Sequence, residues 1–169
     1  FDHDDRSIFS RQIKFIQESG VVTAMVGLLN ALPQTRLWQR LKAEDRLRLD
    51  VSGDNTDGSI NFTPRMDMEK LIAGYRNIVQ TIYNPRNFYQ RVCRFLDQYQ
   101  PRRRRPRERG EIRSFLRSIF YLGVLGNGRS QWYFWKMLIK SLVRYPRLLP
   151  ETMTLMAYGH HFRKVAKRV

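Results

Sequence analysis

Apolar side chains recur three or four residues apart through residues 67–99, the spacing of one face of an α-helix. Asp67 is a favourable helix N-cap, and Asn84 followed by Pro85 is a second helix-start signal. Two amphipathic helices are therefore predicted, each with one face to bury in a helical core. Those faces consist of Leu71, Ile72, Tyr75, Ile78, Val79 and Ile82, and of Phe88, Tyr89, Val92, Phe95, Leu96 and Tyr99.

The helical pattern resumes after an interruption at residues 101–110. Ile112 to Phe120 form one further stretch, and residues 151–163 form the last. Between them, the glycine-rich residues 123–128 predict a turn between helices, since no strand precedes them as a phosphate-binding loop requires. Residues 67–169 are thus predicted to be a helical domain. Its helix after the turn is expected to bury Trp132, Trp135, Ile139 and Leu142.

Residues 1–50 have a different organisation. A helical pattern ends at Gly20, which suits the left-handed stop position. Val21 to Leu29 is a short, β-branched apolar run that predicts a buried parallel strand, and residues 35–41 are helical again. One strand cannot make a sheet, so this part is predicted to be the remnant of an α/β core, which the resemblance given below implies to be a partial barrel. The polar residues 51–66 are interpreted as a connector, with a short strand at 60–62.

The charge is distributed unevenly along the chain. Residues 101–169 contain 17 Lys and Arg against 3 Asp and Glu, whereas residues 1–100 are nearly balanced. Such asymmetry favours an acidic partner, either nucleic acid, an anionic membrane surface or another domain. Within the connector 101–110, an extended surface linker and a patch for an anionic partner both remain open. The patch would consist of Arg102, Arg103, Arg104, Arg105, Arg107 and Arg109.

No catalytic or metal-binding constellation is predicted. Cys93 is the single cysteine, which excludes a disulfide within the chain and every site that needs several thiolates. It borders a helical apolar face and is interpreted as a small core residue. His160 and His161 are neighbours and cannot face one ion from a helix. Two acidic stretches, residues 2–5 and 54–58, are interpreted as a helix start and a turn, because the latter fails the calcium-loop spacing.

Three segments carry a resemblance to a known family. Residues 12–41, QIKFIQESGVVTAMVGLLNALPQTRLWQRL, resemble the last strand–helix unit of the radical SAM core in cobalamin-binding radical SAM proteins of the hopanoid-methylase group. Residues 54–92 and 130–165 resemble the opening and the close of the helical C-terminal domain of unknown function that follows such cores. The family's Pro-Gly-Thr turn reads Pro33-Gln34-Thr35 here, which departs at the glycine.

The resemblance implies a bacterial parent enzyme with a [4Fe–4S] cluster, S-adenosylmethionine and cobalamin. The chain has neither the Cys-x-x-x-Cys-x-x-Cys motif nor the Asp-x-His-x-x-Gly motif, so it is expected to be the non-catalytic C-terminal part and to bind no cofactor alone. Its first residue, Phe1, also suggests a piece of a longer protein. The resemblance places Leu28, Leu29, Asn30 and Ala31 beside the adenosine group, with an ordinary buried strand end as the alternative. The expected partner is the rest of the parent.

The cysteine usage fits a reducing compartment such as the cytoplasm. The longest apolar run has nine residues, against roughly 20 for a membrane-spanning helix. The expected localisation is therefore cytoplasmic, with peripheral membrane association as an alternative that the basic tail would support.

Overall fold

The computed structural model describes residues 2, 4–48, 59–100, 117, 119–124 and 128–168. This part of the chain is mainly helical, which confirms the predicted fold class. Its elements are α1 (Ser7–Ser19), α2 (Arg36–Ala43), α3 (Met68–Ile82), α4 (Pro85–Gln98), the π-helix η1 (Phe120–Val124), α6 (Gly128–Arg144), the 3-10 helix η2 (Pro146–Leu148) and α7 (Leu149–Ala166).

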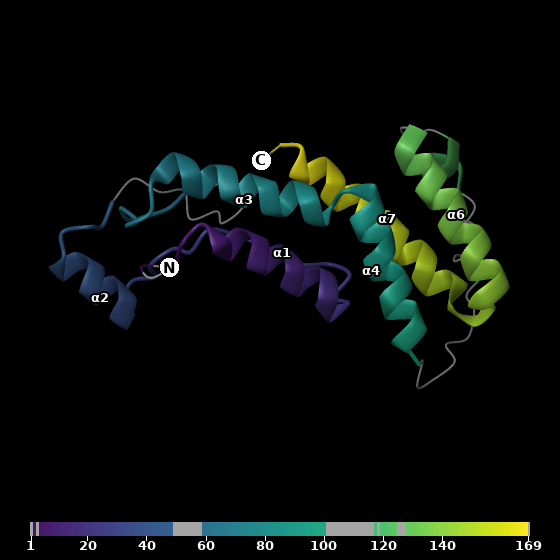
Figure 1. The fold of residues 1–169 in the computed structure, drawn as a ribbon, viewed down its shortest axis with the longest axis horizontal. Coiled ribbons are helices and arrows are strands. Elements are labelled where there is room, and N and C mark those ends of the chain that lie inside the picture. Colours follow the sequence, from purple (N-terminus) through teal and green to yellow (C-terminus); the bar gives the residue numbers. More distant parts are fainter. Residues whose placement is uncertain are drawn as a thin grey trace.

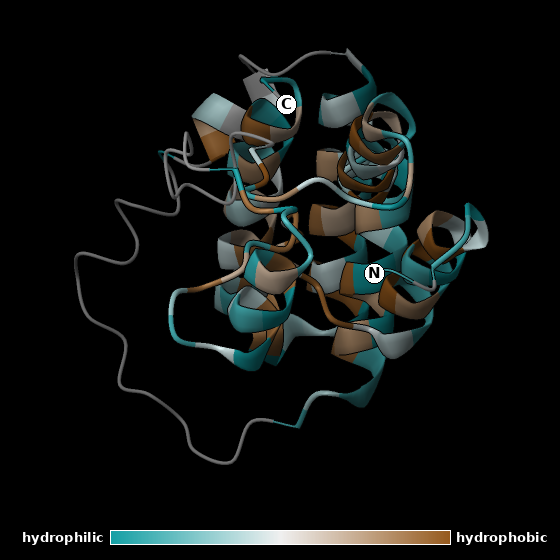
Figure 2. Ribbon diagram, turned by 90° about the vertical axis from the view of Figure 1, so that its left-hand side faces the viewer, coloured by the Kyte–Doolittle hydropathy of each residue, from teal (hydrophilic) through white to brown (hydrophobic). Residues whose placement is uncertain are grey.

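The starts of α3 and α4 and the end of α1 lie where the local sequence signals predict, whereas α1 and α7 begin without a capping side chain. Thr35, Asp67 and Asn84 each accept, through their side-chain oxygen, a hydrogen bond from a backbone N–H two or three residues further on. These bonds satisfy donors that a helix start leaves without an intrahelical partner. Gly20 closes α1 with a φ of 72°, in the left-handed region that glycine adopts without steric cost. Figure 2 shows hydrophobic and hydrophilic residues alternating along the helices.

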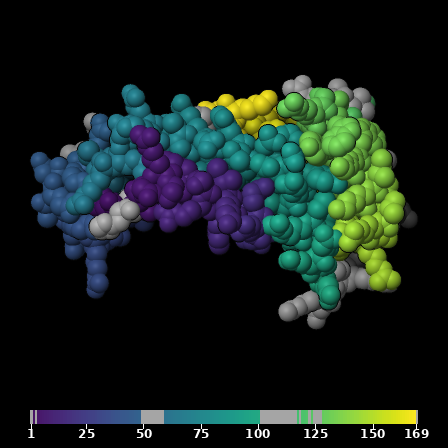
Figure 3. All heavy atoms as spheres, viewed as in Figure 1, coloured from purple at the N-terminus to yellow at the C-terminus, as the bar shows by residue number. Residues whose placement is uncertain are grey.

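The molecule is elongated (Figure 1). The helix α2 lies at one end, α1 and α3 lie side by side in the middle, and α4, α6 and α7 pack together at the other end. The helix α7 also reaches back to α3, so that the middle and the far end share one core. The space-filling view shows α1 lying directly against α3 (Figure 3).

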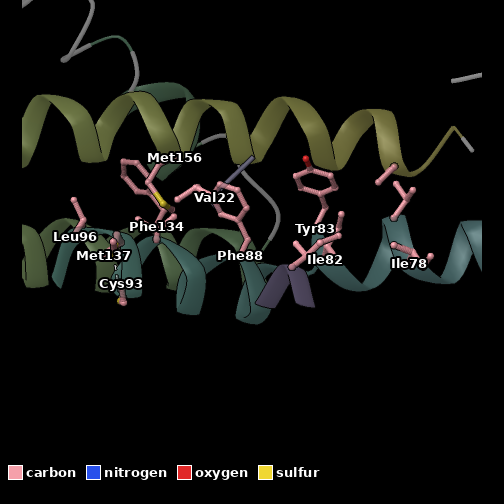
Figure 4. Close-up of a cluster of buried hydrophobic side chains, with 14 of the residues drawn as sticks. Val22, Ile78, Ile82, Tyr83, Phe88, Cys93, Leu96, Phe134, Met137 and Met156 are labelled. Atoms are coloured by element: carbon pink, nitrogen blue, oxygen red, sulfur yellow. Dashed lines mark hydrogen bonds between the residues drawn. The ribbon is translucent and has the colours of Figure 1, made fainter. Parts of the chain in front are cut away.

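The main core follows the length of α7, as Figure 4 shows. Phe88 is almost fully buried, and its ring lies so close to Gly159 that a Cβ there would come within 2.3 Å of it. The absence of a side chain at this position lets α4 and α7 approach closely. The other side chains of this core come from α1, the segment after α1, α3 and the residue that follows it, α4, α6 and α7. They include Ile16, Val22, Leu28, Tyr75, Ile78, Ile82, Tyr83, Val92, Leu96, Phe134, Met137 and Met156.

A smaller apolar cluster joins α2 to the segment that leads into α3. It is formed by Ala31, Leu41, Ile60 and Phe62. Phe62 makes an isolated antiparallel bridge with Leu47, which is all that the structure has of the short strand predicted at 60–62. Ile60 and Phe62 are buried, so this end of the predicted connector is part of a packed unit.

Three further predictions concern the chain between α4 and α7. The arginine-rich connector 101–110 lies outside the described residues, as does most of the helix predicted at 112–120. Gly123 lies in η1 rather than in a turn, and the Trp135 indole N–H donates a hydrogen bond to its carbonyl over 3.1 Å. The expectation that α6 buries its tryptophans is wrong. The face that α6 buries consists of Phe134, Met137, Leu138 and Ser141.

Candidate functional site

The run predicted to be a buried strand is an extended segment that continues to residue 32, and we refer to residues 21–32 as the extended segment. Its side chains alternate, as in a β-strand. Over residues 21–29 the even-numbered side chains face the helices, whereas Val21, Met25 and Leu29 face outward and are 49%, 83% and 49% exposed. At the end of the segment this pattern reverses, because Ala31 is buried and Leu32 is 65% exposed. The segment is thus half buried, and the expectation of a fully buried strand is wrong. Val22, Ala24, Val26 and Leu28 form the inward face.

Side chains of α4 and of the residue that ends α3 hold the first half of the extended segment. The Tyr83 hydroxyl donates a hydrogen bond to the Ala24 carbonyl over 2.7 Å and accepts one from the Ala24 N–H over 3.2 Å. This phenol therefore occupies the place of a neighbouring strand for one residue. Arg91 donates a hydrogen bond to the Val22 carbonyl over 3.2 Å and another to the side chain of Gln17 in α1.

Arg91 is a buried cation, 1% exposed, that no carboxylate of the described residues pairs with. Its guanidinium lies 5.6 Å and 5.8 Å from the ring centres of Phe88 and Tyr83, and burial lowers its pKa to about 10. A buried charge is costly unless it is hydrogen-bonded. The bonds to Val22 and Gln17 therefore make the position of the extended segment and that of α1 depend on one another.

An amide side chain holds the second half of the extended segment. Asn61 donates a hydrogen bond to the Ala31 carbonyl and accepts one from the Ala31 N–H, both over 2.7 Å. The Asn61 backbone N–H in turn donates to the side-chain oxygen of Asn30 over 2.9 Å. Between these two clamps, no hydrogen bond within the described part of the chain reaches the backbone of residues 25–29. Side chains thus fix the ends of a strand-like segment, and its centre has no ladder partner there.

A cavity of about 310 Å³ lies beside the centre of the extended segment, between α1 and α3. Two of the residues predicted to lie beside the adenosine group, Leu28 and Leu29, line it together with the neighbouring Val26 and Gly27. Asn30 and Ala31 contact Asn61 instead. The opposite wall is apolar and includes Ile8, Phe9, Leu71 and Ile78. Polar groups in the lining come from Asp2, Asp4, Gln12, Arg65 and Tyr75, which sequence reasoning missed because they are far apart in the chain.

An ion-pair network lies at one side of this cavity. Arg46 donates two hydrogen bonds to the Asp2 carboxylate, over 2.9 Å and 3.1 Å, and Arg40 donates a third over 3.0 Å. The bonds from Arg46 are the largest cause that lowers the pKa of Asp2, and the same contact raises the pKa of Arg46. The network ties the start of the chain to the end of α2.

The other sequence-derived candidates have simpler surroundings. Cys93 is buried beside Met137, as predicted for a core residue, and the Lys140 ammonium lies 3.2 Å from its sulfur. In the described residues, no three His, Cys, Asp or Glu side chains come together as a metal site would require. The six arginines predicted to form an anionic-partner patch lie outside the described residues, so that patch stays a prediction. None of the described helices is long and apolar enough to cross a membrane.

The described residues thus form a mainly helical domain that carries one extended segment without a strand partner among them. The chain belongs to the family of the domain of unknown function DUF4070, whose model matches residues 35–169. This confirms the resemblance of the helical part to a domain of unknown function.

Two curated relatives share most of the chain. It is 28% identical over 168 residues to an uncharacterized methyltransferase of Synechocystis sp., a match that covers 96% of this chain and 31% of the relative. It is 26% identical over 158 residues to the hopanoid C-2 methylase of Rhodopseudomonas palustris, covering 88% of this chain and 28% of that protein. No solved structure matches the chain. The chain therefore spans about three tenths of the length of these relatives.

Proposed function

We propose that the chain is the C-terminal segment of a radical SAM methylating enzyme of the cobalamin-binding group. In this proposal residues 21–32 add a strand to the α/β core in the rest of the enzyme, and the helical domain covers that core and shapes access to its substrate site. The observation that carries the proposal is the extended segment itself. It has a strand's alternation, a buried inner face, an apolar outer face and a central backbone without partners among the described residues.

The size of the relatives supports the same reading. Both are about three times as long as the matched region, and their names describe methyl transfer. A chain that matches less than a third of each leaves room for the strands that the extended segment needs. The boundaries 1–50, 51–66 and 67–169 remain our proposed division between core remnant, connector and helical domain.

The resemblance implies an iron–sulfur cluster, S-adenosylmethionine and cobalamin, and the residues of this chain suit only part of this set. An iron–sulfur cluster is held mainly by cysteine thiolates, and Cys93, the chain's single cysteine, is buried between α4 and α6. The cluster ligands and the cobalamin site would therefore come from the rest of the enzyme. S-adenosylmethionine bound to the cluster would supply the radical for the reaction.

The cavity beside Leu28 and Leu29 fits the adenosine side of that cofactor better than its charged end. Its lining is mostly apolar, and Gly27 exposes backbone there without a side chain. We propose that Leu28 and Leu29 contact the adenosine group directly, whereas Asn30 and Ala31 fix the turn beyond it through Asn61. The apolar wall from α1 and α3 would exclude water from this side.

Hydrogen exchange on the full-length enzyme tests the strand proposal. The backbone amides of Met25, Val26 and Gly27 have no acceptor in the described part of the chain. Pairing with a strand of the core should protect them at least as strongly as the amides of α1, which serve as the internal reference. Exchange at the rate of a free peptide would show that the segment has no strand partner in the enzyme.

A second experiment tests the enzyme class separately. The full-length protein, purified without oxygen, should contain iron and cleave S-adenosylmethionine on reduction. A protein without iron and without cleavage would contradict the radical SAM assignment. Protection of residues 25–27 in such a protein would still support the added strand, so the two halves of the proposal can fail independently.

A further inference from the structure

The outer face of α6 combines an exposed apolar stripe with a row of cations, and these side chains lie outside the buried core. We define this face by the stripe Trp132, Trp135, Ile139, Leu142 and Val143 and the row Lys136, Lys140 and Arg144. We propose that it docks on the surface of an anionic lipid bilayer. This inference does not depend on the radical SAM assignment.

The stripe is contiguous and exposed. Trp132, Trp135 and Ile139 follow one another at three- and four-residue steps, and Leu142 and Val143 lie three and four residues after Ile139, so all five lie on one side of the helix. Trp132 is 56% exposed, Ile139 59% and Val143 80%. The opposite side of α6, around Phe134 and Met137, already packs into the core. A helix that is apolar on both sides is typically covered on both sides, so the stripe calls for a partner.

The cations lie at four-residue steps along one flank of the stripe. The Lys136 ammonium is 4.7 Å from the centre of the Trp132 ring and 5.3 Å from that of Tyr89 on α4. Together with Tyr89 and all of the stripe except Leu142, they line an open groove of about 770 Å³. Residues 128–144 contain no Asp or Glu, and only Asp97 of α4 pairs with the row among the described residues, through Arg144 over 3.3 Å. Figure 3 shows that α6 forms the outer surface at its end of the molecule.

This chemistry matches a helix that lies in the membrane interface. Tryptophan prefers the headgroup region, aliphatic side chains enter the boundary with the acyl chains, and Lys and Arg reach anionic phosphates. Nucleic acid fits less well, because bases stack on aromatic rings and the aliphatic half of the stripe would stay uncovered. A second copy of the chain fits less well too. Residues 128–168 carry nine Lys and Arg against one Glu, so the same positively charged regions of two copies would repel each other.

Vesicle co-sedimentation of the full-length enzyme tests the proposal. The enzyme should pellet with vesicles of phosphatidylcholine and phosphatidylglycerol, not with phosphatidylcholine alone, and rising salt should release it. Ile139→Asp and Val143→Asp should abolish the pelleting without unfolding the protein, since both side chains are exposed. Lys136→Gln with Lys140→Gln should weaken it roughly tenfold or more. The matched controls are Phe15→Asp and Lys14→Gln, exposed positions of α1 that should bind like the wild type.

Three results would overturn the proposal. The wild type could fail to bind the anionic vesicles. It could bind them equally well with Asp at positions 139 and 143, which would assign the binding to other cations. The Asp variants could instead lose the packing of α6 against the rest of the enzyme, detected as new protease cleavage in the absence of vesicles. That result would identify another domain of the same enzyme as the occupant of this face.

Discussion

Single side chains replace missing strand neighbours in this molecule. Tyr83 and Asn61 each bond both the N–H and the carbonyl of one residue of the extended segment, Ala24 and Ala31. Tyr83 also stacks on Phe162 of α7, with ring centres 5.2 Å apart, so its hydroxyl is held rigidly. Burial raises the pKa of Tyr83, and the hydroxyl, which is protonated at neutral pH even at the usual tyrosine pKa of about 10, can donate.

We expect Tyr83→Phe to loosen the extended segment without disturbing the core. The ring stays, but the partly buried N–H and carbonyl of Ala24 lose their partner, which costs about 1 kcal/mol or more. Hydrogen exchange should show faster exchange of the Ala24 amide, and denaturant unfolding should show the lower stability. Tyr158→Phe, at a half-exposed position of α7, is the control and should change neither. An unchanged Ala24 exchange rate in the Tyr83 variant would mean that the phenol does not hold the segment.

At the scale of elements, the sequence predicts features that depend on neighbouring residues better than features that depend on contacts with distant parts of the protein. The starts of α2, α3 and α4 follow from Thr35, Asp67 and Asn84, because a cap acts within three residues. The burial of residues 21–29 was harder to predict. A short, mostly apolar run is typical of a strand that is buried on both faces. In this segment the helices bury one face, and the other face could be buried only by residues outside the described part of the chain. The sequence therefore predicts the extended conformation but not its half exposure.

The same reasoning gives a prediction for Met25, whose side chain is 83% exposed. In the isolated chain Met25→Asp should change the stability by no more than about 0.5 kcal/mol, as expected for a surface position. In the full-length enzyme, where the proposed strand buries Met25, the same change should cost roughly 2 kcal/mol or more, because it buries a carboxylate. Thermal melting of both forms measures the difference. Phe15→Asp is the control, and an equally small effect of Met25→Asp in both forms would argue against burial.

For the whole molecule, composition and periodicity predicted the helical class but not which surfaces are free. In α6 two apolar stripes compete, one with Trp132 and Trp135 and one with Phe134 and Met137. The spacing fits both, and only the positions of α4 and α7 select the second. The cavity could not be predicted from the sequence either, because its lining residues Asp2, Arg65 and Leu28 come from distant parts of the chain. The excess of positive charge could be predicted from the sequence, because net charge depends on the composition and not on the fold.

The network of Asp2 with Arg40 and Arg46 should make the stability of the molecule depend on acid pH. A carboxyl whose folded pKa is lowered contributes stability above its unfolded pKa, about 3.9, and the contribution is lost as the pH falls through the lower folded value. Wild type should therefore lose stability between about pH 5 and pH 2, and Asp2→Asn should lose less over this range, having lost that contribution at neutral pH.

Urea unfolding across this pH range measures the effect, and Arg46→Gln provides the matched partner variant. Both variants remove the contact between Asp2 and Arg46, and Arg46→Gln also removes the bonds of Arg46 to Glu44 and to the Thr63 carbonyl. The double variant should therefore lose less stability at neutral pH than the sum of the two single losses, whereas unrelated sites would add. Additive losses would show that the carboxylate and the guanidinium act separately. In that case the start of the chain would be held beside the cavity by apolar packing of Ile8 and Phe9 rather than by this ion pair.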